Sequence, residues 1–216
     1  MTQLSTTSYA VLGLLALRDW TTYELAKQMQ RTIDYVWPTG ERTLYDEPKR
    51  LVEAGYARAR KESVGKRPRT TYTITPAGRR ALKQWLSTEA APMTVEFEGM
   101  LRVLFADQGD LEQLRQSIHA IAEQARTGRG QFATMAKDIL ASGGEFPQRT
   151  HVNALGMRFM IDHYDQIITW ADWALKNVQT WNDTTTPGSS WAGTARQILI
   201  DATQKAEPES FDDHSS

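Results

Sequence analysis

The basic segment from Gly40 to Ile74 constrains the fold of this chain more than any other part of the sequence. Apolar residues recur at helical spacing in its first half and alternate with polar residues in its second half. Gly55 separates the halves, and glycine readily adopts the left-handed conformation that ends many helices. The segment therefore predicts a helix, a strand, a basic turn and a second strand, over residues 41–54, 56–62, 63–68 and 69–75 respectively.

Two predicted helices precede this segment and one follows it. Ser8 can cap the first helix, which is apolar on nearly every side and should be buried. Thr21 or Thr22 can begin the second helix, with Glu24 placed to form a capping box. Thr75 can cap a helix that starts with proline after the second strand. Three helices, a two-stranded hairpin and a fourth helix together predict a winged helix-turn-helix.

Pro48 conflicts with a regular third helix. An interior proline removes a backbone hydrogen bond and costs about 3 kcal/mol in an ordinary helix. Either the helix kinks at Pro48, or Asp46 caps a shorter helix that has Pro48 in its first turn. We favour one kinked helix, because Leu44 keeps its helical phase with Leu51.

The predicted third helix and hairpin suit duplex DNA. The major groove, about 12 Å wide, accepts a helix whose first residues read base edges. Cationic wing tips suit phosphates or the minor groove, although any of these cations could instead belong to an ordinary solvated face. The candidate DNA-binding residues are Arg42, Thr43 and Tyr45 at the start of the helix, Lys49 and Arg50 further along it, and Lys66, Arg67 and Arg69 at the wing.

Charge is divided unevenly along the chain. Residues 1–91 carry 15 Lys and Arg against 9 Asp and Glu, whereas residues 92–216 carry 10 against 17. This asymmetry suggests that only the first part meets a polyanion. We expect a mainly α chain with a winged helix-turn-helix DNA-binding domain, an all-α dimerisation and effector domain and a disordered acidic tail, over residues 1–91, 92–206 and 207–216 respectively.

An apolar seam is the clearest periodicity in the second part. Its members recur at alternating spacings of three and four, which is typical of a helix in a coiled-coil-like contact. We predict that this seam forms a homodimer interface, and packing within one chain is the alternative. The seam consists of Met157, Met160, Tyr164, Ile167, Ala171, Ala174, Val178 and Trp181.

Six short motifs in the first part match one family as a set. They are Leu12-Gly13-Leu14-Leu15, Tyr23-Glu24-Leu25, Leu44-Tyr45, Lys49-Arg50-Leu51, Glu53-Ala54-Gly55-Tyr56 and Thr75-Pro76-Ala77-Gly78. Together they resemble the PadR family of winged-helix transcriptional regulators, over roughly residues 8–88. The long helical second part, with Phe97-Glu98-Gly99-Met100-Leu101-Arg102, resembles the larger subgroup of that family, whose C-terminal helices dimerise.

The resemblance implies a homodimeric repressor-type regulator, and we expect that a small-molecule effector releases it from DNA. It places a third-helix tyrosine and a nearby lysine close to DNA, which correspond here to Tyr45 and Lys49. A two-fold dimer predicts a pseudo-palindromic operator. The main departure from the family pattern is Pro48, because a kink there would re-aim Lys49 and Arg50.

Other classes of function find little support. The chain has no cysteine and no phosphate loop, HExxH or nucleophile-elbow motif, so we expect neither an enzyme nor a cofactor. Its four histidines lack metal-site spacing. No apolar run approaches the roughly 20 residues of a membrane span, so we expect a cytoplasmic protein with no membrane contact.

The seven tryptophans are more often core residues than ligand contacts, although a small aromatic effector at the dimer interface is compatible with them. A winged helix that binds protein instead of DNA is the alternative function.

Overall fold

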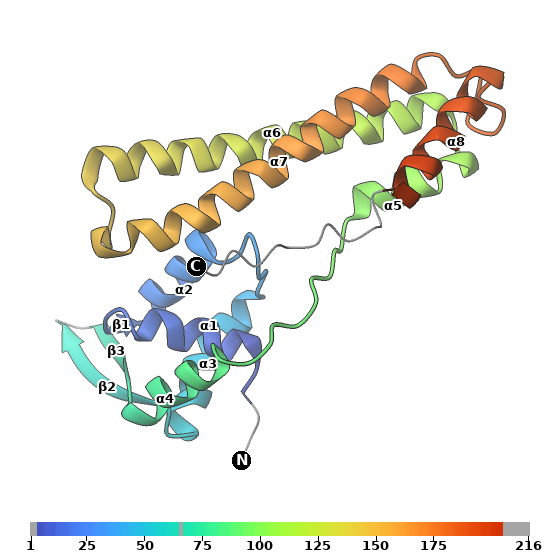
Figure 1. The fold of residues 1–216 in the computed structure, drawn as a ribbon. Helices are drawn as coiled ribbons and strands as arrows, with labels where there is room; N and C mark the ends of the chain where they lie inside the picture. The colour runs from blue at the N-terminus through green and yellow to red at the C-terminus, as the bar shows by residue number, and fades with distance from the viewer. Residues whose placement is uncertain (1–3, 65–66, 205–216) are drawn as a thin grey trace, which may run out of the picture. The chain divides into compact units, whose positions relative to one another are not determined.

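The computed structural model describes residues 4–64 and 67–204 and divides the chain into two compact units, Met1–Met93 and Thr94–Ser216 (Figure 1). The expected tail, residues 207–216, lies outside the described residues. The first unit has the predicted winged helix-turn-helix architecture. Its elements are α1 (Thr6–Leu15), β1 (Trp20–Thr21), α2 (Thr22–Thr32), α3 (Glu41–Glu53), β2 (Ala57–Val64), β3 (Arg67–Ile74) and α4 (Pro76–Trp85).

Local capping chemistry starts the helices of the first unit. Thr21 caps α2 and forms the predicted capping box with Glu24, and Thr75 caps α4 as predicted. The predicted cap of α1 is wrong by one turn: Ser5 caps this helix, and Ser8 is the partner three residues on that completes the capping box. Five of the ten residues of α1, including Ser8, are buried, and only Thr6 is exposed, as expected for a helix that packs in the core.

The third helix runs through Pro48 without a break, from Glu41 to Glu53, so the alternative of a shorter helix capped by Asp46 is wrong. Pro48 is fully buried, at helical spacing from two other inward-facing residues, Leu44 and Leu51. Burial of its ring offsets part of the cost of the missing backbone hydrogen bond. A bend of the helix axis at Pro48 stays a prediction.

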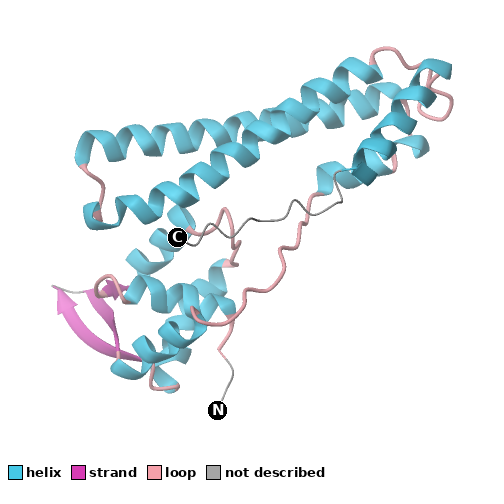
Figure 2. Ribbon diagram, viewed as in Figure 1, coloured by secondary structure: helices cyan, strands magenta, loops and turns pink. Residues whose placement is uncertain are grey.

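The antiparallel hairpin of β2 and β3 is confirmed, and it pairs from Ala57↔Ile74 to Val64↔Arg67. Each strand reaches two residues further toward the turn than predicted. The sequence did not predict β1, which adds a third strand beside β3 through the pairs Trp20↔Tyr72 and Thr21↔Thr71 (Figure 2).

The second unit is helical throughout its regular elements (Figure 2). Two long helices lie side by side and pack along their length (Figure 1). No helix among the described residues is long and apolar enough to cross a membrane. The elements are α5 (Glu98–Leu104), η1 (Ala106–Gln108), α6 (Leu111–Ser142), η2 (Pro147–Arg149), α7 (Thr150–Val178) and α8 (Ser189–Gln204).

All members of the apolar seam except Trp181 lie on α7, and the seam contributes largely to packing within one chain. Ala171, Ala174 and Val178 are buried in a cluster with apolar residues of α6. These three residues therefore fit the alternative of packing within one chain, because buried side chains are not available to a second copy of the chain. Met160 is also buried, while the other members of the seam, Met157, Tyr164, Ile167 and Trp181, are half-buried. Their role in a dimer stays a prediction.

Candidate nucleic-acid interface

The outer face of α3 is strongly exposed and carries most of the candidate DNA-binding residues. Because Leu44 and Leu51 face the core, the side chains of the remaining faces point to solvent. The side chain of Arg42 is 96% exposed, and those of Lys49 and Arg50 are also exposed. Thr43 is exposed as well, whereas Tyr45 is half-buried. This face can offer several donors to a polyanion or to base edges.

A carboxylate on this face joins two of the candidate cations. Asp46 Oδ1 lies 2.9 Å from Lys49 Nζ, and Asp46 Oδ2 lies 3.6 Å from Arg42 Nε. The hydrogen bond from Lys49 is the main reason that the pKa of Asp46 lies below its ordinary value, and the same bond raises the pKa of Lys49. Asp46 and Lys49 are therefore both charged near neutral pH. The spacings of three and four residues could have revealed this cluster from the sequence.

A buried carboxylate fixes α3 against the first helix. Glu47 is only 4% exposed and accepts a hydrogen bond from the Ser8 hydroxyl of α1. Arg50 Nη1 lies 3.7 Å from Glu47 Oε2, so this cation is oriented by a group from the core side of α3. Sequence reasoning missed Glu47, although its position between Leu44 and Leu51 placed it on the buried face of the helix.

The structure describes the wing cations only in part. Arg69 is exposed on β3, and its Nη2 lies 3.3 Å from Glu24 Oε2 at the start of α2. Lys66 lies outside the described residues; the backbone of Arg67 pairs with Val64, and its side chain is not described. Further cations, Arg58, Arg60 and Lys61, are exposed on β2. The wing therefore adds positive charge to the same unit that carries α3.

The carboxylate of Glu24 links the helix cap to the wing. The pKa of Glu24 lies below its ordinary value, first because the Thr21 side chain and backbone donate hydrogen bonds to it, and then because Arg18 and Arg69 are near. A carboxyl whose pKa is lowered by folding stabilises the folded state above its ordinary pKa of 4.5. This contribution is lost as the pH falls through the lower folded value.

Glu24→Gln should therefore destabilise the protein only where the carboxyl is ionised. Glutamine keeps the capping hydrogen bonds but removes the charge, so we expect a loss of about 0.5–1 kcal/mol in the free energy of unfolding near neutral pH. The loss should shrink as the pH falls below the ordinary pKa of glutamate. Urea unfolding at several pH values, with Glu53→Gln as a control at an exposed carboxylate of α3, measures it. A deficit that is independent of pH would contradict this account.

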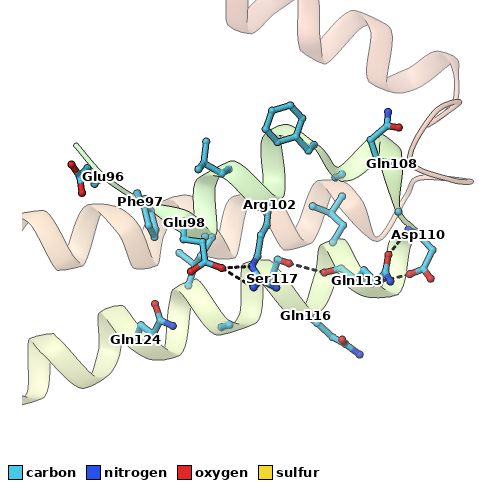
Figure 3. Close-up of a pocket in the computed structure, with 18 residues that line it drawn as sticks. Glu96, Phe97, Glu98, Arg102, Gln108, Asp110, Gln113, Gln116, Ser117 and Gln124 are labelled. Atoms are coloured by element: carbon cyan, nitrogen blue, oxygen red, sulfur yellow. Dashed lines mark hydrogen bonds and ion pairs between the residues drawn. The ribbon is translucent and has the colours of Figure 1, made fainter. Parts of the chain in front are cut away.

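Two cavities lie in the second unit. The larger, about 1070 Å³, is a groove along α5 and the first half of α6 (Figure 3). Figure 3 shows the Glu98–Arg102 ion pair and the capping box of Asp110 and Gln113 in this groove. The smaller cavity, about 460 Å³, is rich in tryptophan. Among the described residues, no cluster of His, Cys, Asp and Glu could hold a metal ion.

Two family models match the chain. Residues 11–84 match the Transcriptional regulator PadR-like family, and residues 98–179 match the family Virulence activator alpha C-term. The Negative transcriptional regulator PadR of Bacillus subtilis (strain 168) is 30% identical over 99 residues, which are 45% of this chain and 54% of that protein. The chain thus spans about half the length of this curated relative.

Solved structures share the fold over most of the chain. Bacillus subtilis PadR in complex with operator DNA matches with a TM-score of 0.70 and 18% identity, covering 81% of this chain and 99% of that one. Bacillus subtilis PadR in complex with p-coumaric acid matches with a TM-score of 0.67, 19% identity and the same coverage. The Vibrio cholerae virulence activator AphA matches with a TM-score of 0.62 and 23% identity, covering 81% and 98%. Identities this low establish the fold alone.

Proposed function

We propose that the chain, whose residues 11–84 match the PadR-like family of transcriptional regulators, binds a specific operator in duplex DNA and represses transcription as a homodimer. The observation that carries this proposal is the exposed cationic face of α3 on a unit whose core fixes that helix. Arg42 and Lys49 stand on this face around Asp46, and Glu47 anchors the opposite face to α1.

Each candidate residue of the interface has a role that its position in the fold supports. Arg42, Thr43 and Tyr45, in the first turns of α3, would read base edges, since recognition helices contact bases with their N-terminal residues. Lys49 and Arg50 would contact phosphates. Lys66, Arg67 and Arg69 would contact the backbone or the minor groove from the wing. The protein would act in the cytoplasm, on DNA, without catalysis.

Binding to DNA is tested by selection from genomic fragments. Full-length protein should retain a small set of duplexes at low salt and hold them against an excess of random competitor. A pseudo-palindromic sequence, with half-sites about one helical turn apart, should be common to the retained duplexes. Failure to retain any duplex would favour the alternative, in which the winged helix binds a protein.

The second unit has exposed apolar side chains that are available to a dimer. On α7, Leu155 is 75% exposed and Phe159 is 56% exposed, on the half of the helix that precedes the buried part of the seam. Exposed apolar residues of this size are typical of an interaction surface when they are close together. We place the homodimer contact on this half of α7.

Charges at the two exposed apolar residues of this half of α7 should break the dimer. Leu155→Glu combined with Phe159→Glu should shift the full-length protein from dimer to monomer in sedimentation, because an apolar interface does not compensate buried carboxylates. Asn153→Glu combined with Gln166→Glu adds the same charge at exposed polar positions of α7 and should leave the dimer intact. A stable dimer of the first variant would show that the contact lies elsewhere.

The proposed repressor is released by a small-molecule effector. Bacillus subtilis PadR has been solved with p-coumaric acid, which shows that a protein of this fold can hold a small aromatic molecule. The tryptophan-rich cavity of the second unit supports the same property here.

A further inference from the structure

The smaller cavity of the second unit is a built aromatic site. Four indole rings line it: those of Trp170 and Trp173 on α7, Trp181 in the loop after α7, and Trp191 on α8. The ring centroids of Trp181 and Trp191 lie 5.1 Å apart, and those of Trp173 and Trp191 lie 6.1 Å apart, both in tilted pairs. Such pairs are attractive and hold each other in place. The volume of about 460 Å³ falls within the range of small-molecule sites.

The loop between α7 and α8 is fastened where it borders the cavity. Thr184, which lines the cavity, donates a hydrogen bond of 3.0 Å from its hydroxyl to the Gly109 carbonyl just before α6. Asp183 accepts hydrogen bonds from the backbone and side chain of Thr185, at 2.7 and 2.8 Å, and from Thr186. These bonds fix the segment that leads into α8, so the wall that carries Trp191 is organised before any ligand arrives.

Two polar features of the lining define what the cavity can recognise. The indole nitrogen of Trp181 is buried and has no hydrogen-bond partner among the described residues, so its N–H is a donor that lacks an acceptor. Asp107 is the only charged residue among the described residues that line the cavity, and none of them is basic. Asp107 is exposed, and its carboxylate accepts a hydrogen bond from the Gln108 side-chain amide.

The charge of the lining selects the charge of the ligand. The faces of indole rings are electron-rich and attract cations, and a carboxylate adds to this attraction. An anion would meet the same faces and Asp107 without a basic partner. We propose that this cavity binds a small aromatic cation that carries a hydrogen-bond acceptor for Trp181, and that this ligand is the effector of the regulator. The second statement rests on the proposed function.

Calorimetry on the full-length protein tests the charge preference. The probe is para-acetylbenzyltrimethylammonium, and para-acetylphenylacetate offers the same ring and acceptor with the opposite charge. We expect the cation to bind at least about tenfold more tightly than the anion. Asp107→Asn should weaken the cation about three- to tenfold and leave the anion no weaker. Asp138→Asn, at an exposed carboxylate of α6 outside the cavity, is the matched control and should change neither affinity.

A second comparison tests the unpaired indole. Benzyltrimethylammonium lacks the acetyl acceptor, and the wild-type protein should bind it about fivefold more weakly than the acetylated probe. Trp181→Phe keeps an aromatic ring and removes the N–H, so this preference should disappear. A merely structural role for Trp181 would weaken both probes alike and keep their ratio, and that result would overturn the hydrogen bond to Trp181.

The remaining outcomes separate this inference from the proposed function. Absence of heat with both cationic probes would overturn the ligand site. A change in oligomeric state on Trp191→Ala would also overturn it, because the cavity would then be a surface for a second copy of the chain. Duplex affinity should fall at least about fivefold when the acetylated probe is bound. Probe binding that leaves duplex affinity unchanged would overturn the effector role. Failure of the unliganded protein to bind any duplex would instead contradict the proposed function and leave the calorimetric result standing.

Discussion

Removing two cations from the outer face of α3 is expected to weaken binding to duplex DNA by one to two orders of magnitude. Arg42→Gln combined with Lys49→Gln removes two exposed side chains that we assign to DNA. Because we assign Lys49 to a phosphate and Arg42 to a base edge, the slope of log affinity against log salt should flatten by about 0.9, the value for one lost phosphate contact. Titration of a selected duplex across a range of salt concentrations measures both quantities.

Asp46 lies between these two cations, so its charge has to be tested in a further variant. With Arg42 and Lys49 neutralised, Asp46 would face the phosphates without a partner and add repulsion of its own. Adding Asp46→Asn to the double variant should therefore restore part of the lost affinity and leave the flattened slope. Arg80→Gln combined with Lys83→Gln makes the same change in net charge on α4, at exposed positions. Equal losses in the α3 and α4 variants would show that only overall charge matters, against our assignment.

A methyl group at Gly78 is expected to destabilise the first unit by about 2–3 kcal/mol, the range of severe overpacking. A Cβ there would lie 2.3 Å from the Tyr56 carbonyl oxygen and 2.9 Å from Ile74 Cγ1. The carbonyl cannot move away freely, because it accepts the hydrogen bond of 3.0 Å from the Thr75 backbone at the cap of α4. Gly78 is thus the residue that lets α4 start directly against Tyr56, just before the start of β2. Urea unfolding followed by circular dichroism measures the loss.

Gly13 provides the matched control for this substitution. It lies inside α1, and a Cβ there would meet nothing within 4 Å beyond its own helix and chain neighbours. Gly13→Ala should therefore stabilise the protein by about 0.5–1 kcal/mol, the usual gain from alanine in a helix interior. Opposite signs for the two glycines are the expected result. A neutral or stabilising Gly78→Ala would show that the contact between Tyr56 and α4 relaxes at little cost.

Features of the fold that depend on neighbours in sequence could be predicted. The capping box of Thr21 and Glu24, the cap at Thr75 and the stop at Gly55 each involve residues at most a few positions apart. The strand β1 could not be predicted, because Trp20 becomes a strand residue only through pairing with Tyr72.

The same limit applies to the candidate site. Exposed cations of α3 follow from helical periodicity, but the hydrogen bond that satisfies the buried Glu47 comes from Ser8, which is 39 positions away in the chain. On α7, the periodicity correctly indicated a packed seam, yet only the neighbouring α6 decides that Ala171 is buried within one chain. Likewise, the sequence shows many tryptophans, and the fold alone gathers Trp181 and Trp191 around one cavity.

The central claim, that α3 reads DNA sequence, is tested most directly by a base-by-base affinity profile. The affinity of the wild-type protein and of Arg42→Ala would be measured for every single base-pair substitution of a selected duplex. The wild type should lose about 1–3 kcal/mol at its sensitive positions. Arg42→Ala should lose discrimination at one position in each half-site and keep it elsewhere. An identical profile for the two proteins would contradict base reading by the start of α3.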